Sequence, residues 1–273
     1  MTGPVPVRRE AVNRDAAPSR DMAQRRPDAG PSDTGDPAAG PRLWALPQIR
    51  HWLLLGVLLS AAVVALGLAA QLTPGFSATE LGVDQDLSHH HIAALTAVAM
   101  GLNVIFGPVA GLALIGAAAL YIWLFRGGLL KAVAFGLVAT SGWVASEIFK
   151  IIVSRQRPNP ALLFDPLAPE NGSDSFPSGH VACAVAVGFA LYFLARGTRW
   201  AKITAFGTAG LALVVAWSRL YIGVHYPSDV AASFLAASAA VVLLTGLWNV
   251  VTPRVADRLR GPSAIPSPAP ERK

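Results

Sequence analysis

Two long stretches of this chain contain no charged side chain. Residues 52–72 and 105–125 each run for 21 residues without Asp, Glu, Lys or Arg. A helix of about 20 apolar residues crosses the hydrocarbon core of a bilayer and satisfies its own backbone hydrogen bonds there. The whole chain is 53% hydrophobic and 14% charged, with a mean hydropathy of +0.48. These features predict an all-α, polytopic membrane protein.

Four further apolar stretches complete the predicted membrane bundle. They cover approximately residues 132–153, 178–195, 203–222 and 230–251. Between the first two spans, residues 83–104 contain the stretch IAALTAVAMGLNV, which is compatible with a seventh span or with an interfacial helix. We favour the interfacial helix, because six spans agree better with the distribution of charge. The expected fold is a six-transmembrane-helix bundle with one interfacial helix, occupying residues 51–251.

Two terminal segments flank this bundle. Residues 1–50 are rich in Pro, Ala, Gly, Asp and Arg, and residues 252–273 hold five prolines and several arginines. Neither segment shows the apolar periodicity that a packed core requires. We therefore expect both to be disordered tails.

The charged residues indicate how the bundle is oriented. Basic residues concentrate in the tails and in the short loops 126–131 and 196–202, whereas residues 73–91 contain acidic residues and no Lys or Arg. Under the positive-inside rule, both termini are cytoplasmic. The net charge of +6 then reflects topology and does not indicate a nucleic-acid partner, because the basic residues form no single stripe. The chain is rich in alanine and arginine, as is typical of proteins from GC-rich bacteria. Its composition therefore favours a bacterial plasma membrane.

Three polar clusters lie at the ends of predicted spans. They are KIIVSRQRP (150–158), PSGH (177–180) and SRLYIGVHYPSD (218–229). A charge at the bilayer centre costs about 2.5–3.5 kcal/mol on insertion scales, so these cations belong at an interface. The predicted topology places all three clusters on the outer side, where they can face one polar ligand.

The spacing within each cluster favours phosphate chemistry. Lys150 and Arg157 are about two helical turns apart, so both can point to one site. The start of a helix at PSGH offers free N–H groups to phosphate oxygens, although a capped helix start without a ligand is an equally good interpretation of that motif alone. Asp229 follows His225 by four residues and can orient its imidazole, although in isolation such a pair is more often structural.

Taken together, the clusters provide fixed cations, two histidines, an orienting carboxylate and a helix N-terminus. Cations and N–H groups can neutralise phosphoryl oxygens, one histidine can attack phosphorus, and the other can protonate the leaving oxygen. This set requires no metal ion or other cofactor.

The order K-x6-RP, PSGH, SR-x5-H-x3-D resembles the motifs of the type 2 phosphatidic acid phosphatase superfamily, over about residues 85–250. The matching residues are Lys150, Arg157, Pro158, Pro177, Ser178, Gly179, His180, Ser218, Arg219, His225 and Asp229. The resemblance implies that His225 is the nucleophile, that Asp229 orients it, and that His180 is the general acid and later the base for water. It also implies phosphate binding by Lys150, Arg157, Ser178, Gly179 and Arg219.

The resemblance implies a metal-independent membrane phosphatase acting on a lipid phosphate or diphosphate at the outer face through a phosphohistidine. Undecaprenyl diphosphate is the favoured substrate by family analogy, and phosphatidate and phosphatidylglycerol phosphate remain alternatives. A noncatalytic lipid-phosphate binder or transporter would keep the cations but would not need both histidines and Asp229. A lipid phosphotransferase would share the complete motif set.

Several polar residues near these clusters have competing interpretations. Three successive histidines, 89–91, cannot all face one ion on a regular element, so we expect them at the headgroup surface. Glu147 precedes Lys150 by three residues and is expected to form an ion pair with it. Arg155 is expected to bind a second phosphate or to lie in a solvated loop or headgroup contact.

Overall fold

The computed structural model describes Gly3 and residues 45–260 apart from 169, 171 and 173, and this part of the chain is helical without a strand. The predicted tails lie largely outside the described residues. The helices are α1 (Trp52–Leu72), α2 (Phe76–Ser88), α3 (Ala93–Ile105), α4 (Pro108–Ile122), α5 (Gly128–Val153), α6 (Gly179–Ala195), α7 (Ala201–Ile222) and α8 (Pro227–Arg260). A π-helical turn, Trp123–Gly127, joins α4 to α5, and a 3-10 turn covers Pro160–Leu162.

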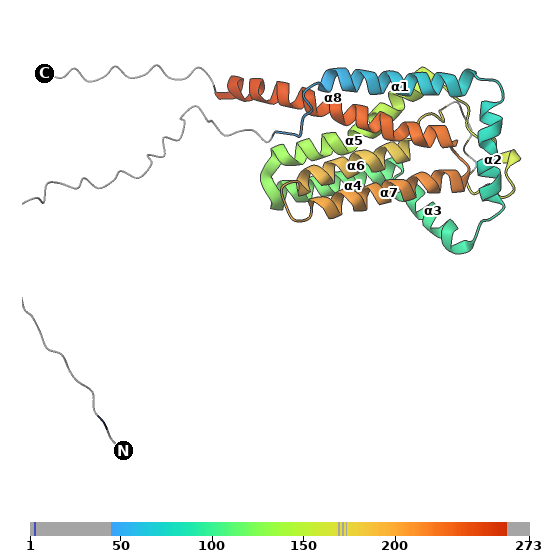
Figure 1. Ribbon diagram of the computed structural model, residues 1–273, viewed down its shortest axis with the longest axis horizontal. Helices are drawn as coiled ribbons and strands as arrows, with labels where there is room; N and C mark the ends of the chain where they lie inside the picture. Colours follow the sequence, from blue (N-terminus) through green and yellow to red (C-terminus); the bar gives the residue numbers. More distant parts are fainter. Residues whose placement is uncertain (1–2, 4–44, 169, 171, 173, 261–273) are drawn as a thin grey trace, which may run out of the picture. The chain divides into compact units, whose positions relative to one another are not determined.

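Helices α5 and α6 form the centre of the bundle. Helix α5 packs against α6, α8 and α4, and α6 also packs against α7 and α8. Helix α1 covers α8. Figure 1 shows these helices running alongside one another, with α2 lying across one end of the bundle. The ends of α5 and α7 and the starts of α6 and α8 therefore meet near α2.

The outer surface of the bundle is strongly apolar. Val109 on α4, Ile151 on α5 and Phe206 on α7 are each about four-fifths exposed. Apolar stretches long enough to cross a membrane cover Trp52–Leu72, Pro108–Val153, Ala201–Ile222 and Pro227–Val255. The second of these contains both α4 and α5, and α6 is a shorter apolar helix. The chain is thus an integral membrane protein with the predicted bundle of α1 and α4–α8.

The segment between the first two spans differs from the expectation of one interfacial helix. It forms two helices, α2 and α3, which a turn at residues 89–92 separates. Helix α3 has 13 residues, or about 20 Å of length, which is too short for a 30 Å hydrocarbon core. Helix α2 was not predicted, because its sequence FSATELGVDQDLS has no strong apolar face.

Both predicted tail boundaries also differ from the structure. Helix α8 continues to Arg260, beyond the predicted end at 251, even though it contains Pro253. At the other end, Leu46 is buried and exchanges two backbone hydrogen bonds with the Asn249 side chain, of 3.0 and 2.8 Å. The segment just before α1 is therefore anchored to α8. Residues 1–44 and 261–273 lie outside the described residues.

A close approach of two helices positions the start of α6. A Cβ atom added to Gly142 of α5 would lie 2.2 Å from the Ala182 carbonyl oxygen and 2.8 Å from the Ala186 Cβ. Small residues at such a crossing allow the backbones of membrane helices to pack tightly. Gly142 therefore sets the separation between α5 and α6.

We expect Gly142→Ala to lower the free energy of unfolding by about 1–3 kcal/mol, because the new methyl group must push the α6 backbone away. The measurement is unfolding of the purified protein in mixed detergent micelles titrated with a denaturing detergent. Gly136→Ala, on the same helix but with open space around the glycine, is the matched control and should not destabilise. Equal stability of the two variants would contradict the proposed packing constraint.

Candidate active site

The ends of four helices bring the three polar clusters together. Helix α5 ends at Ser154, which adopts a left-handed conformation, and Gly223 ends α7 in the same way. The short loop after Gly223 places His225 directly before Pro227, the first residue of α8. Across these segments, the Arg157 guanidinium donates to the Val224 carbonyl oxygen at 3.3 Å. The clusters therefore form one polar site at one end of the bundle.

Two arginines of this site share a carboxylate. Arg157 donates to Glu170 at 2.5 Å, and Arg219 donates to the other oxygen of Glu170 at 3.5 Å. Arg157 also pairs with Asp174 at 2.7 Å, and this pairing lowers the pKa of the Asp174 carboxyl. Arg219 is fully buried, whereas the Glu170 side chain is 37% exposed. The arginines thus converge on an anion at the edge of the site.

Lys150 forms the predicted ion pair with Glu147, at 2.8 Å. Its side chain is 12% exposed. Burial lowers the pKa of His225 well below its usual value, and the positive charges of Arg157, Arg219 and Lys150 lower it further. The three predicted phosphate-binding cations therefore lie around a histidine that is neutral at physiological pH. A neutral imidazole has the free electron pair that a nucleophile requires.

Asp229 lies behind His225. The His225 Nδ1 atom is 3.6 Å from Asp229 Oδ2, and both side chains are almost completely buried. Asp229 Oδ2 also accepts from the Ser175 hydroxyl and from the Tyr226 backbone N–H, the latter at 3.0 Å. The predicted orienting pair is therefore close, but a small movement is needed for a hydrogen bond between its members.

The start of α6 presents hydrogen-bond donors to the same region. Ser178 occupies the N-cap position and is fully buried. Its hydroxyl and the Arg219 Nε–H have no hydrogen-bond partner among the described residues. A Cβ atom on Gly179 would approach Ser146 and Trp143 at 3.3 Å, so this position favours glycine. Free N–H groups at a helix start, together with these side-chain donors, suit a phosphoryl group.

His180 and Arg219 are both held by Asn103, a residue that the sequence analysis did not select. His180 Nε2 lies 3.0 Å from the Asn103 carbonyl oxygen, and Arg219 donates to the Asn103 side-chain oxygen. Asn103 lies near the end of α3. In the sequence, Asn103 is a single amide side chain in an otherwise apolar stretch. Such a pattern is too weak by itself to identify a site residue.

The surroundings of Arg155 contradict both interpretations made from the sequence, which were binding of a second phosphate and a place in a solvated loop or headgroup contact. It is 2% exposed and forms ion pairs with Asp229 at 2.6 Å and with Glu80 at 2.7 Å. It is therefore neither a solvated loop residue nor free to bind a second phosphate. No local pattern could reveal this, because both partners are distant in the sequence.

The three histidines at 89–91 point to different partners. His89 packs against the Phe164 ring, and His90 contacts the Asp86 carbonyl oxygen at 2.7 Å. His91 lies 2.9 Å from Asp165 and 2.8 Å from the Tyr221 carbonyl oxygen. Their ring nitrogens therefore serve local packing around the start of α3.

The fold and the site together define a helical membrane protein with a cluster of basic side chains at one end of its bundle. Residues 129–252 match the family model of the PAP2 superfamily. The matched stretch contains the three motifs whose order resembles that superfamily.

Curated relatives match part of this chain. Undecaprenyl-diphosphatase BcrC of Bacillus subtilis (strain 168) is 32% identical over 123 residues, which cover 43% of this chain and 59% of that protein. An undecaprenyl-diphosphatase of Sulfolobus acidocaldarius is 35% identical over 99 residues, covering 35% of this chain and 44% of the relative. The matches thus span roughly half the length of these relatives.

A solved structure shares the fold. The crystal structure of a transmembrane PAP2 type phosphatidylglycerolphosphate phosphatase from Bacillus subtilis aligns with a TM-score of 0.58 at 23% identity. The alignment covers 72% of this chain and 97% of the crystallised chain. The helical arrangement described above is therefore that of a known membrane fold.

We expect Glu170→Gln to tighten the binding of inorganic phosphate by up to about fivefold, because the exposed carboxylate competes with the anion for Arg157 and Arg219. Calorimetric titration of the protein in a neutral detergent at fixed ionic strength measures this change. Asp165→Asn removes a charge from the same loop, where Asp165 contacts His91, and is the control. Unchanged or weaker phosphate binding in Glu170→Gln would contradict the competition.

Proposed function

We propose that this protein is a metal-independent membrane phosphatase that hydrolyses a lipid phosphate or diphosphate through a phosphohistidine. The observation that carries this proposal is a buried His225 that lies 3.6 Å from Asp229, with a pKa that burial and the charges of three cations hold well below its usual value. A binding site would need the cations, but it would not need a histidine held in its nucleophilic form.

In the first step, the phosphoryl oxygens accept hydrogen bonds from Arg157, Arg219, Ser178 and the start of α6, near Gly179, while Lys150 adds positive charge. His225 Nε2 attacks phosphorus, a nitrogen–phosphorus bond forms, and the bond from phosphorus to the leaving oxygen breaks. Asp229 stabilises the positive charge that develops on the imidazole. His180 gives a proton to the leaving oxygen.

In the second step, water attacks the phosphohistidine. His180, now neutral, takes a proton from the water, and the nitrogen–phosphorus bond breaks to release phosphate. His225 returns to its starting form, while the same donors stabilise the charge on the phosphoryl oxygens.

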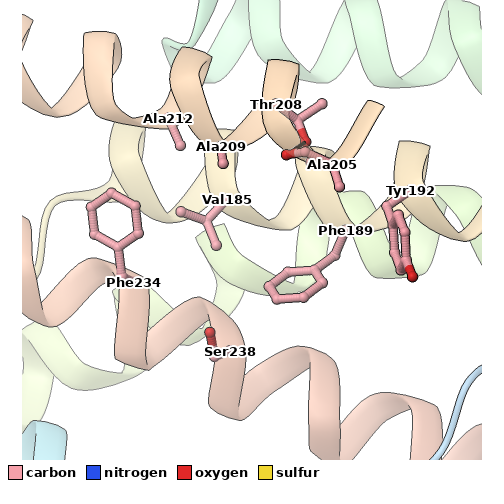
Figure 2. A pocket seen from close by; sticks show the side chains of 10 residues that line it. Val185, Phe189, Tyr192, Ala205, Thr208, Ala209, Ala212, Phe234 and Ser238 are labelled. Carbon is pink, nitrogen blue, oxygen red and sulfur yellow. Dashed lines mark hydrogen bonds between the residues drawn. The ribbon is translucent and has the colours of Figure 1, made fainter. Parts of the chain in front are cut away.

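The position of the site favours a substrate with an apolar tail. The polar residues lie at one end of a bundle whose sides face lipid, so a tail can stay in the bilayer while its headgroup reaches His225. Figure 2 shows an apolar cavity between α6, α7 and α8 into which Val185, Phe189 and Phe234 point. Its volume is about 340 Å³. Part of an acyl or prenyl chain would fit there.

Undecaprenyl diphosphate is the substrate we favour. Two relatives described above are named undecaprenyl-diphosphatases and are 32% and 35% identical to this chain over 123 and 99 residues. Phosphatidate and phosphatidylglycerol phosphate present the same terminal phosphate to the site and are the nearest alternatives.

We expect His225→Ala to reduce phosphate release at least about 1000-fold, because the variant lacks the imidazole that forms the proposed covalent intermediate. Release is measured in detergent with a chelator present, across undecaprenyl diphosphate, phosphatidate and phosphatidylglycerol phosphate. His90→Ala, which changes an exposed histidine outside the site, is the control.

Loss of phosphate release on adding chelator would reject metal independence. Binding of these lipids without release by the unmodified protein would favour a binder or transporter, and transfer to a lipid acceptor would favour a phosphotransferase.

We further propose that the site faces the outside of a bacterial plasma membrane and that both termini are cytoplasmic. The basic loops 126–131 and 196–202 lie at the ends of the helices opposite the site. The pairing of Leu46 with Asn249 puts the approach to α1 at that same basic end. The positive-inside rule assigns this end to the cytoplasm.

In a Cys183→Ala background, we expect Leu162→Cys to react with a membrane-impermeant maleimide in intact cells, because this exposed residue lies at the site end. Trp200→Cys, exposed at the opposite end, should react only after the membrane is permeabilised. Modified protein is detected by a mass shift on a gel. The opposite labelling pattern would place the site in the cytoplasm.

A further inference from the structure

A buried arginine joins the site to helix α2. Arg155 donates through one terminal nitrogen to Asp229 Oδ1 at 2.6 Å and through the other to Glu80 Oε2 at 2.7 Å. Its guanidinium also stacks under the Tyr226 ring, 4.2 Å from the ring centroid. Arg155 is 2% exposed and is not among the phosphate-binding residues assigned above. Its contacts instead lead to Asp229.

The contacts of Asp229 divide between its two oxygens. Arg155 occupies Oδ1, while Oδ2 faces Ser175, the Tyr226 N–H and the His225 imidazole. Rotation of the carboxylate would break the bond to Arg155 and turn Oδ2 away from His225. Arg155 therefore determines which oxygen meets the imidazole.

Glu80 connects this arrangement to the start of α8. One of its oxygens accepts from the Ser228 backbone N–H at 2.8 Å, and the other accepts from the Ser228 hydroxyl at 2.7 Å. The Ser228 hydroxyl in turn accepts from Arg155 at 2.7 Å. A carboxylate at a helix start satisfies a free N–H group and interacts favourably with the helix dipole. Glu80 thus holds both Arg155 and the first turn of the helix that carries Asp229.

The carboxyl groups around Arg155 need a nearby positive charge, which Arg155 supplies. Glu80, Asp84 and Asp229 are three carboxyl groups close together, and Asp84 and Asp229 are fully buried. Burial, together with the negative charges of Asp229 and Glu80, raises the pKa of Asp84 to about 8, so Asp84 is largely protonated at neutral pH. Arg155 then neutralises one of the two remaining charges. Without that cation, a charged Asp229 would be strongly disfavoured in its buried position.

We propose that Arg155 and Glu80 are positioning residues that keep Asp229 charged and direct its Oδ2 atom at His225 Nδ1. This inference rests on the proposed function, since it assigns the two residues to the histidine nucleophile. Neither residue contacts the phosphoryl group. Both act through Asp229, and α2 is thereby part of the catalytic structure.

A double-mutant cycle tests this coupling. We expect Arg155→Lys to lower kcat by about 10- to 100-fold, the range typical for residues that orient a catalytic ligand, with KM changed less than about threefold. In an Asp229→Asn background, Arg155→Lys should lower kcat by less than about threefold. The charged carboxylate through which Arg155 acts is already absent from that background. Equal losses in both backgrounds would overturn the inference.

Glu80→Gln provides a second test if Arg155→Lys does not fold. It keeps the shape of the side chain while removing its charge, and we expect a lower kcat with an unchanged KM. Asp86→Asn removes a charge from an exposed position on the same helix and is the matched control. Full kcat in a folded Glu80→Gln variant would overturn the role of Glu80.

A measurement without turnover separates this inference from the proposed phosphatase activity. In protein with ¹⁵N-labelled histidine, the signals of His225 are assigned by their loss in His225→Gln. We expect Arg155→Lys to change the tautomer or the Nδ1–H signal of His225 in the absence of substrate. Unchanged His225 signals would overturn the positioning role even if the unmodified protein releases no phosphate. If the unmodified protein releases no phosphate but Arg155→Lys alters the His225 signals, the phosphatase proposal is rejected and the positioning role of Arg155 stands.

Discussion

The ion pair between Arg155 and Asp229 is almost completely closed to solvent, and the polar end of the bundle is organised around it. Removing one partner of a buried pair typically costs about 3–5 kcal/mol, because the other charge is left uncompensated. The pair therefore forms favourably only when the segment after α5, helix α2 and the start of α8 are all in place. The same assembly brings His225 next to Asp229, so the contacts that stabilise this end also hold the site together.

The arginines of the site fall into two groups with different partners. Arg155 is surrounded by buried groups that cannot leave without exposing unpaired charge. Arg157 and Arg219 instead share Glu170, whose side chain is partly exposed and can return to water at little cost. Fixed partners suit a residue that maintains geometry, and exchangeable partners suit residues that receive an anion. The contacts of each arginine thus support the proposed positioning role of Arg155 and the proposed binding roles of Arg157 and Arg219.

The membrane part of the fold supplies a rigid frame for this end. Gly142 lets α5 and α6 pack with their backbones close together, which holds Ser178 and His180 at a defined place relative to the end of α5. Along the rest of the bundle, the exposed surface is apolar and the buried positions are mainly small residues. Because hydrocarbon penalises unpaired charge, the ionisable groups gather at the end, where several elements can satisfy them together.

Much of this organisation follows from local properties of the chain. Runs of uncharged residues predicted the membrane helices, because the length and hydropathy of one segment decide whether it can cross a bilayer. The spacing of Lys150, Arg157, His225 and Asp229 predicted a phosphate site, which stays a prediction, and carried the resemblance to the superfamily whose model matches residues 129–252. Tail boundaries were less accurate, since a helix end such as that of α8 depends on packing as well as composition.

The roles of Arg155, Glu80 and Asn103 became visible only in the folded molecule. Arg155 and Arg157 are two residues apart, and only Arg157 belongs to the motif. The sequence did not reveal that Arg155 meets Glu80 and Asp229 in the interior while Arg157 meets Glu170 at the edge. Helix α2 has too weak a pattern to be predicted, and it is the element that brings Glu80 to Arg155. Length, hydropathy and motif spacing are properties of one segment, whereas the pairing of buried charges depends on segments far apart in the chain, and folding alone brings these together.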